Sequence, residues 1–306
     1  MTTNGSKVKT GQTLAVIGCG NMAGAILSGI MASCAKTLSS GAEPRFSHFI
    51  ATVNSEESAK RLRSRFSHYD DCLHIIKGEN VTAMDTADIV LLGFKPYMID
   101  NVLAVHGVRE ALLGKLVISV LAGSPVEKLK GAIYGDRPHD SWSTPVKEKN
   151  IYIKRAMMNI AAEYGESMTV LETNPDIPKA YEELTEWMFS QLGKTAPVAP
   201  ENYDIAGVMA GASGALLSIA FDGMLDGAVS QGMKRADANK ILTQSLISLA
   251  TLLQNEHPAV LREKISSPKG TTIAGLLSLE EDRARYAFSK ATIAASERSK
   301  QIGKQA

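Results

Sequence analysis

The stretch LAVIGCGNMAGAI, residues 14–26, decides how the first part of this chain folds. Its apolar opening is typical of a buried strand, and the glycines Gly18 and Gly20 then lead into a helical pattern. The first glycine permits a tight turn, the second lets a ligand approach the backbone, and the small Ala23 lets helix and strand pack closely. The stretch therefore predicts the first βα unit of a parallel sheet.

The spacing G-x-G-x-x-G/A also suits the pyrophosphate of a dinucleotide, because free N–H groups at the helix start point at its anionic oxygens. A glycine turn that binds nothing is the alternative. Strand-like segments at residues 48–53, 87–94 and 116–123 alternate with helical patterns, and this rhythm indicates βαβ units. The predicted fold class is α/β, with a Rossmann-type dinucleotide-binding sheet domain.

The sheet domain is predicted to span residues 1–197, with a polar, proline-containing surface insertion at about 135–150. After two further strand-like segments, residues 179–193 form an amphipathic helix that Gly193 closes at a C-cap position.

Residues 198–306 are predicted to form a separate all-helical domain, with long helical patterns over 202–232, 236–256 and 272–302. This domain is rich in Ala and Gly and poor in aromatic residues, which leaves little material for a core of its own. Its helices are expected to bury small-residue faces against a partner subunit. The sequence thus predicts a homo-oligomer.

The composition is that of an ordinary globular protein, because 44% of the 306 residues are hydrophobic and the formal net charge is +1. This balance argues against nucleic-acid and membrane-surface partners. The longest uncharged stretch lies between Asp204 and Asp222 and is too short to span a bilayer, so a buried helix is expected there. Three cysteines without CxxC spacing predict neither a disulfide framework nor a metal site, and a polar N-terminus favours the cytoplasm.

Asn54 and Ser55 follow the second predicted strand, where an NAD-binding protein normally places a carboxylate for the ribose hydroxyls. Their hydrogen-bond donors, with Arg61 from the next helical turn, suit a 2′-phosphate, so NADPH is favoured and NADH remains possible. Glu56 opposes this assignment because its carboxylate would repel the phosphate. The alternative is that Asn54 and Ser55 only cap the following helix.

Lys95, Pro96 and Ala122 lie at the carboxyl ends of the next two predicted strands. Ligands of open α/β sheets bind at these ends, so the three residues are candidates for the same site. Loop residues without a ligand are also common there.

Residues 264–275, KISSPKGTTIAG, interrupt the helical domain with a turn and restart it on Thr271 and Thr272. Free N–H groups and hydroxyls at the positive end of a helix suit a carboxylate. An ordinary helix–loop–helix turn with N-capping threonines is the alternative.

Several segments together resemble the pyrroline-5-carboxylate reductase family over nearly the whole chain. They are IGCGNMAGAI, FKP, ISVLAG, RAMMNIAAEYGESMT and, most specifically, LREKISSPKGTTIAGLLSLE at residues 261–280. The resemblance implies a nucleotide-binding domain followed by a helical dimerisation domain. It also implies reduction of the cyclic imino acid Δ1-pyrroline-5-carboxylate to proline with NADPH or NADH, in a homodimer that joins through the C-terminal helices and in this family often forms larger rings.

The resemblance further implies site residues. The cofactor would contact Gly18, Gly20, Asn21 and Met22 at the pyrophosphate, Asn54, Ser55 and Asn80 at the adenosine end, and Lys95, Pro96 and Ala122 at the nicotinamide half. The substrate would contact Ser267, Lys269, Gly270, Thr271, Thr272 and Asn159. Hydride transfer to C5 of the ring needs mainly positioning and charge complementarity, and Thr272, bonding the ring nitrogen, is the candidate catalytic side chain.

Three departures from the family pattern concern the substrate. The family's MPNTP is MMNIA at residues 157–161, its GSGPA is GASGA at 211–215, and its SPGGTT is SPKGTT, with Lys269 where the turn favours glycine. A specialised reductase acting on a substituted or larger cyclic imine in secondary metabolism is therefore an alternative. A catalytically silent dinucleotide-binding protein is a second one.

Overall fold

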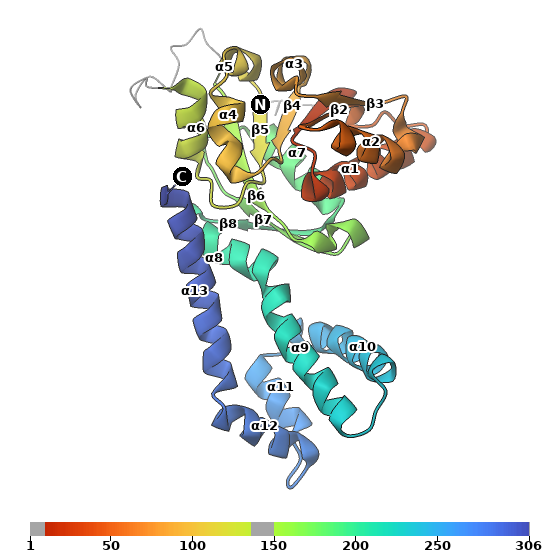
Figure 1. Cartoon of the computed structure of the whole chain (residues 1–306), viewed down its shortest axis with the longest axis vertical. Coiled ribbons are helices and arrows are strands. Elements are labelled where there is room, and N and C mark those ends of the chain that lie inside the picture. Colours follow the sequence, from red (N-terminus) through yellow and green to blue (C-terminus); the bar gives the residue numbers. More distant parts are fainter. Residues whose placement is uncertain (1–9, 136–149, 306) are drawn as a thin grey trace, which may run out of the picture. The chain divides into compact units, whose positions relative to one another are not determined.

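The computed structural model describes residues 10–135 and 150–305 (Figure 1). The chain divides into two compact units: unit 1 contains the described residues up to Gly211 and those from Ser296 onward, and unit 2 is Ala212–Ala295. The polar insertion predicted at about 135–150 lies, apart from its two end residues, outside the described residues. The domain boundary predicted after residue 197 stays a prediction; the last strand of the sheet ends at Val198.

Unit 1 is built on an eight-stranded sheet with the order β3-β2-β1-β4-β5-β6-β7-β8. Neighbouring strands are parallel except for the antiparallel pair of β6 and β7. The strands are β1 (Gln12–Ile17), β2 (Phe46–Val53), β3 (Leu73–Lys77), β4 (Ile89–Leu92), β5 (Leu116–Ser119), β6 (Tyr152–Met157), β7 (Ser167–Glu172) and β8 (Gly193–Val198). The predicted α/β fold with a Rossmann-type sheet domain is confirmed.

Helices cover both faces of this sheet. They are α1 (Asn21–Ser39), α2 (Glu56–Arg65), α3 (Asn80–Thr86), α4 (Ile99–Leu103), α5 (Val108–Leu112), α6 (Val126–Tyr134), α7 (Lys179–Ser190) and α8 (Tyr203–Gly207). Short 3₁₀ turns occupy Ser67–Tyr69, Pro96–Met98, Ile160–Tyr164 and Pro200–Asn202, and a π turn occupies Val208–Ala212.

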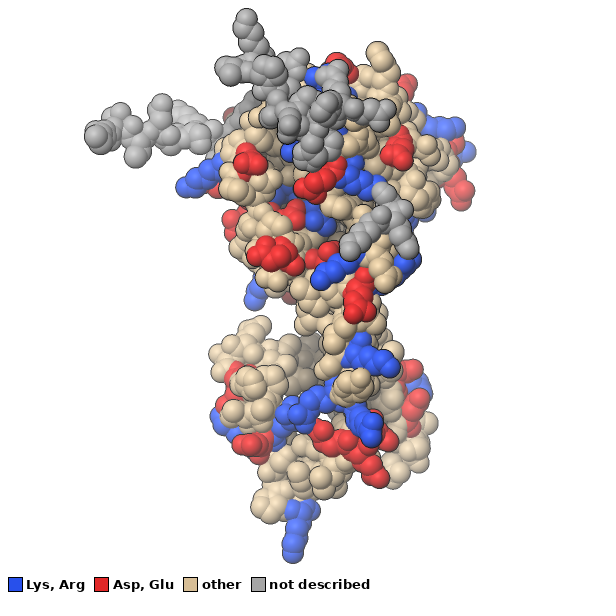
Figure 2. Space-filling model, turned by 90° about the vertical axis from the view of Figure 1, so that its left-hand side faces the viewer, with Lys and Arg blue, Asp and Glu red and all other residues tan. Residues whose placement is uncertain are grey.

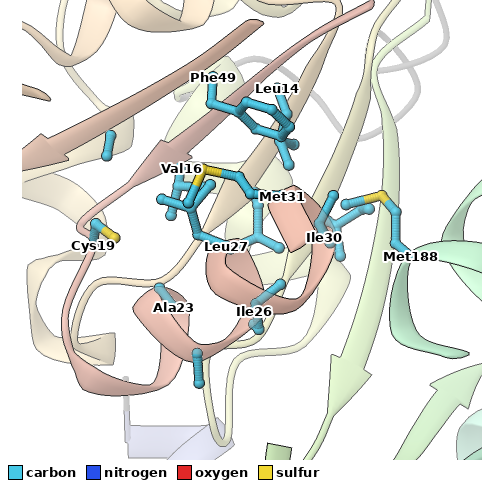
Figure 3. Packing of buried hydrophobic residues seen from close by; sticks show 14 of the residues in the cluster. Leu14, Val16, Cys19, Ala23, Ile26, Leu27, Ile30, Met31, Phe49 and Met188 are labelled. Atoms are coloured by element: carbon cyan, nitrogen blue, oxygen red, sulfur yellow. The ribbon is translucent and has the colours of Figure 1, made fainter. Parts of the chain in front are cut away.

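The core of unit 1 forms where α1 packs on β1. Val16 of β1 and Ile26, Leu27 and Ile30 of α1 are completely buried, and Met188 of α7 reaches the same cluster (Figure 3). Burying each large aliphatic side chain contributes about 1.5–3 kcal/mol. This packing fixes the start of α1 at the end of β1.

The two strands that the sequence pattern did not reveal, β3 and β8, are the two edges of the sheet. An edge strand is less buried than a central one, so its apolar signal is weaker, and β8 also contains Pro197. Gly193 opens β8 and does not close α7, which was wrongly predicted. A Cβ on Gly193 would lie 2.1 Å from the carbonyl oxygen of Ser167, so only glycine permits this strand pairing.

Unit 2 consists of helices whose apolar side chains are largely exposed. They are α9 (Ser213–Ser230), α10 (Arg235–Leu253), α11 (Pro258–Ile265), α12 (Thr271–Glu281) and the first part of α13 (Ala284–Gln305). In α9 only Leu225 is buried, and Ile219 has 73% of its surface exposed. On the visible face of unit 2 in Figure 2, basic and acidic residues are interspersed with uncharged ones.

Two helical stretches among the described residues are long and apolar enough to cross a membrane by length and composition. Asn21–Ser39 contains α1, a core helix of unit 1. Pro200–Ser230 contains α8, the π turn and α9; its mean hydropathy is 1.6, and only 11% of its apolar window is buried. The stretch between Asp204 and Asp222, which was expected to form a buried helix, is largely exposed in the single chain, and Val208 and Ala210 are its buried residues.

Candidate active site

The turn after β1 has the geometry that the two glycines predict. Gly18 has a φ of +79°, and its N–H donates to Thr52 Oγ1 at 3.1 Å. A Cβ on Gly18 would lie 2.8 Å from the backbone nitrogen of Phe94, which follows β4. Only glycine fits both the left-handed conformation and this close approach. The anchor Thr52 was not identified from the sequence, because a threonine inside a strand carries no special signal.

Gly20 is the N-cap of α1 and leaves open space at the helix start. A Cβ on Gly20 would have no atom within 4 Å, and no acidic residue lies in the first turn. Asn21 follows and is exposed, and Met22 is half-buried. Open space in front of unpaired N–H groups at the positive end of a helix fits an anionic group such as a pyrophosphate.

Ala23 explains the third position of the motif. It is completely buried, and a Cβ on Gly93 at the end of β4 would lie 2.5 Å from the Cβ of Ala23. Two small residues therefore let α1 and the sheet come close together, as the sequence predicts.

Asn54 and Asn80 lie in one small pocket at the carboxyl ends of β2 and β3. Gly18, Thr52 and Gly78 also line this pocket. Asn80 is the first residue of α3 and not its cap, since Glu79 holds that position. The structure thus brings together three residues that were predicted separately for the cofactor.

Ser55 is the N-cap of α2, and its Oγ accepts a hydrogen bond from the Ser58 N–H at 3.2 Å. The carboxylate of Glu56 pairs with Arg63 at 3.0 Å. Burial raises the pKa of the Cys19 thiol to about 12, against the opposing charges of Arg65 and Arg61. A Cβ on Gly24 would lie 3.3 Å from Nη1 of Arg65, so this guanidinium lies beside the first turn of α1.

Lys95, Pro96 and Ala122 lie at the same carboxyl edge of the sheet. Lys95 is exposed as the N-cap of the 3₁₀ turn after β4, and Ala122 is exposed after β5. Gly123 has a φ of +60°, and a Cβ there would lie 2.6 Å from Cγ2 of Ile302. The end of α13 therefore covers the loop that carries Ala122.

Asn159 follows β6 at this edge, but its side chain already has protein partners. Its Nδ2 donates to the Ala210 carbonyl oxygen at 2.8 Å, and its Oδ1 accepts from the Ala161 N–H at 3.1 Å. Ile160, the next residue of the departing segment MMNIA, has 79% of its surface exposed.

Residues 267–272 belong to unit 2 and comprise the turn before α12 and the first two residues of that helix. Thr271 begins this helix, as predicted, and Gly270 is its N-cap. Lys269 has a φ of +58°, so the turn keeps the left-handed conformation although the residue is not glycine. A Cβ on Gly270 would lie 2.4 Å from Ser267 Oγ and 3.1 Å from the Ser267 carbonyl oxygen, so a larger residue there would require Ser267 to shift. Thr272 is half-buried, and Ser267 and Lys269 are exposed.

A buried charged cluster lies beneath the same edge and was not foreseen. Arg155 pairs with Glu172 at 2.9 Å, and its guanidinium lies 3.9 Å from the centre of the Tyr203 ring. Burial raises the pKa of Glu172 although Arg155 opposes the shift. Two adjacent basic residues, Lys154 and Arg155, in an otherwise largely apolar strand are the sequence feature that could have revealed this cluster. Among the described residues, no group of three or more His, Cys, Asp or Glu side chains could hold a metal ion.

Comparison with known proteins agrees with this geometry. Residues 200–302 match the family model for pyrroline-5-carboxylate reductase dimerisation, and residues 13–123 match the model for NADP oxidoreductase, coenzyme F420-dependent. The chain is 39% identical over 303 residues to a pyrroline-5-carboxylate reductase of Lophium arboricola, covering 95% of this chain and 93% of the relative. The chain belongs to the pyrroline-5-carboxylate reductase family.

Other members of the pyrroline-5-carboxylate reductase family are similar over comparable lengths. The Neurospora crassa reductase is 35% identical over 91% of this chain and 89% of its own. The Streptococcus pyogenes 1-pyrroline-5-carboxylate reductase has the same fold, with a TM-score of 0.77 at 24% identity, over 95% of this chain and 98% of its own. A Plasmodium falciparum pyrroline carboxylate reductase with NADP bound also has a TM-score of 0.77, at 21% identity, over 96% and 99% of the chains.

Proposed function

We propose that this protein is an oxidoreductase that reduces Δ1-pyrroline-5-carboxylate to L-proline with NAD(P)H in proline biosynthesis. The observation that carries the proposal is the combination, in one chain of this family, of the glycine turn at Gly18 and Gly20 with the Thr271 turn before α12. The first suits a dinucleotide pyrophosphate and the second a carboxylate. Similarity to named reductases over almost the full length supports the same activity.

The cofactor would lie along the carboxyl edge of the sheet. Gly18, Gly20, Asn21 and Met22 would contact the pyrophosphate, Asn54, Ser55 and Asn80 the adenosine, and Lys95, Pro96 and Ala122 the nicotinamide half. The open space at Gly20 supports this arrangement. When bound, the reduced nicotinamide supplies the hydride that C5 of the imine accepts.

The residues of the chain would bind and orient the imine. Ser267, Gly270 and Thr271 would hold the substrate carboxylate, and Lys269 would add a positive charge beside it. Thr272 would donate a hydrogen bond toward the ring nitrogen and keep C5 in line for the hydride. A protonated cyclic imine is already a good electrophile, so positioning and charge complementarity supply most of the acceleration.

NADPH is the proposed physiological cofactor, with NADH as the second choice. The pairing of Glu56 with Arg63 supports this preference, because it compensates the carboxylate that directly follows Ser55 and would repel a 2′-phosphate. The positive charges of Arg65, beside the first turn of α1, and of Arg61 on α2 favour the extra phosphate as well.

A homodimer that joins through the C-terminal helices is proposed as the working unit. The exposed apolar residues of α9 and α10 support it, since a large exposed apolar surface on a globular protein marks an interaction site. Larger rings, a cytoplasmic location and independence of membranes and nucleic acids are proposed with it. Three free cysteines, Cys19, Cys34 and Cys72, suit a reducing compartment.

The deciding experiment follows the loss of NADPH absorbance, and then that of NADH, when Δ1-pyrroline-5-carboxylate is added to the full-length protein. A six-membered cyclic imino acid and an uncharged cyclic imine serve as comparison substrates. Turnover well above both comparisons supports the proposal. Turnover of another imine alone would replace it with a specialised imine reductase, which the exposed Ile160 would suit. NADPH binding without any turnover would indicate a silent binding protein.

A further inference from the structure

Alternate residues at the end of β6 contact one face of the helical run that starts at Tyr203. Arg155 places its guanidinium carbon 3.9 Å from the centre of the Tyr203 ring. Two residues later, Met157 packs against Gly207, where a Cβ would lie 3.2 Å from Met157 Cγ. The intervening Ala156 is buried in the main core, so the strand alternates as expected.

Asn159 makes the third contact of this series. It lies two residues beyond Met157 in an extended conformation, with φ −120° and ψ 172°. Its Nδ2 donates to the Ala210 carbonyl oxygen at 2.8 Å. Tyr203, Gly207 and Ala210 are spaced by four and three residues, which places them on one face of a helix. Residues two apart on the strand thus meet successive turns of the helix.

The Ala210 carbonyl lies inside the π turn Val208–Ala212. A π turn inserts one residue into a helix and disturbs the backbone hydrogen bonds around it, so a side-chain donor is valuable there. The first of the two segments of unit 1 ends at Gly211, within the same turn. Asn159 therefore fixes the backbone at the point where the chain leaves unit 1.

The remaining polar atoms of Asn159 also have protein partners. Its Oδ1 accepts from the Ala161 N–H at 3.1 Å, and its own N–H donates to Ser167 Oγ at 3.3 Å. A side chain held at both ends in this way is poorly suited to contacting a substrate, which was the role implied by the family resemblance.

We propose that Asn159 is a positioning residue that locks the π turn through which the chain leaves the first segment of unit 1. Its kinetic effect rests on the proposed function, because residues 267–272 of unit 2 would hold the substrate. The hydrogen bond from Asn159 to Ala210 that forms this lock does not depend on a ligand. It acts together with Arg155 and Met157 on the same helical face.

Asn159→Asp tests the lock. The variant keeps the size of the side chain and the acceptor for the Ala161 N–H, but it turns a carboxylate oxygen toward the Ala210 carbonyl in place of a donor. We expect faster hydrogen–deuterium exchange at residues 208–212 in the cofactor-free protein. We also expect kcat to fall on the order of tenfold to a hundredfold, since a small misplacement has that effect, while KM and the NADPH dissociation constant stay within about twofold.

Gly207→Leu provides a second, independent variant. It disturbs the neighbouring contact with Met157 and carries no polar atom that could affect a substrate carboxylate. The same signature is expected: faster exchange at 208–212 and a lower kcat with little change in KM. Gly211→Ala is the matched control, because its Cβ would meet only the Met158 carbonyl oxygen, at an ordinary 3.7 Å. Because alanine favours a helical backbone more than glycine does, this control should not speed exchange at 208–212 and should leave kcat unchanged.

Two outcomes would overturn the lock. The first is unchanged exchange at 208–212 in Asn159→Asp. The second is a rise in KM for the imino acid in Asn159→Asp that Gly207→Leu does not share, which would make Asn159 a substrate contact. If the wild-type protein turns over no imine, the proposed reaction fails, and the exchange measurement still decides whether Asn159 holds the π turn.

Discussion

The helix α1 in unit 1 and the helical run Pro200–Ser230 have similar apolar character and opposite surroundings. Their mean hydropathies are 1.2 and 1.6, yet 44% of the first window is buried and only 11% of the second. α1 packs against β1 and α7 of its own chain, as Figure 3 shows. Hydropathy therefore predicts that a helix will be covered, but it does not say which chain supplies the cover.

The largest expected effect comes from a charge on the exposed apolar surface of α9. Ile219→Asp should prevent dimer formation and abolish activity, because an unpaired carboxylate buried in an apolar interface costs on the order of several kcal/mol. Light scattering coupled to size exclusion, with activity assays, measures both. Leu38→Asp is the control, since Leu38 on α1 is 65% exposed and lies in unit 1. If Ile219→Asp still forms a dimer of normal activity, the exposed apolar surface of α9 is not covered by a partner subunit.

The glycine turn tests how tightly unit 1 is packed. Gly18→Ala should lower the free energy of unfolding by about 2–4 kcal/mol, because its Cβ meets the backbone of Phe94 in a left-handed conformation. Gly20→Ala should change stability by less than about 0.5 kcal/mol and weaken NADPH binding about tenfold or more by filling the space for the pyrophosphate. Chemical denaturation measures the loss of stability, and fluorescence titration measures NADPH binding. Equal losses of stability in Gly18→Ala and Gly20→Ala would contradict the assignment of Gly18 to packing and Gly20 to the pyrophosphate site.

Lys269→Gly tests whether the lysine in the turn of unit 2 lowers stability through its backbone conformation while its charge helps to bind the substrate. Removing a non-glycine residue at φ +58° should stabilise the turn by about 1 kcal/mol. Losing the ammonium group should raise KM for Δ1-pyrroline-5-carboxylate about twofold to fivefold, the range of an exposed ion pair. Kinetics with an uncharged cyclic imine are the control. The same relative change in KM for both substrates would mean that Lys269 does not interact with the substrate carboxylate.

The smallest effect concerns Glu172 in the buried cluster of unit 1. Burial raises the pKa of its carboxyl, so the folded state holds the proton more tightly than the unfolded state. That contribution is complete below the unfolded value and is lost as pH rises through the folded pKa. The melting temperature of the wild type relative to Glu172→Gln should therefore fall as pH rises above 4.5. If the difference in melting temperature instead grows with pH, the charge of Arg155 outweighs burial in setting the pKa of Glu172.

The local sequence pattern was sufficient to predict elements whose residues contact mainly their near neighbours in the sequence. The strand, the turn at Gly18 and Gly20 and the start of α1 were predicted, because backbone conformation and short-range packing fix them. The start of α12 at Thr271 followed for the same reason. The edge strands β3 and β8 were not predicted, since partial exposure weakens the apolar pattern.

The sequence by itself determined the α/β sheet and the glycine turn, but it left open whether Lys269 keeps the left-handed conformation of its turn, which the structure shows. Only the tertiary structure decided that Arg155 lies under Tyr203 and that Asn159 bonds to Ala210. These contacts join residues about fifty positions apart, and the direction of a side chain across such a gap depends on how strand and helix pack. Periodicity identifies which face of an element is buried, whereas its partner is fixed only when the whole chain has folded.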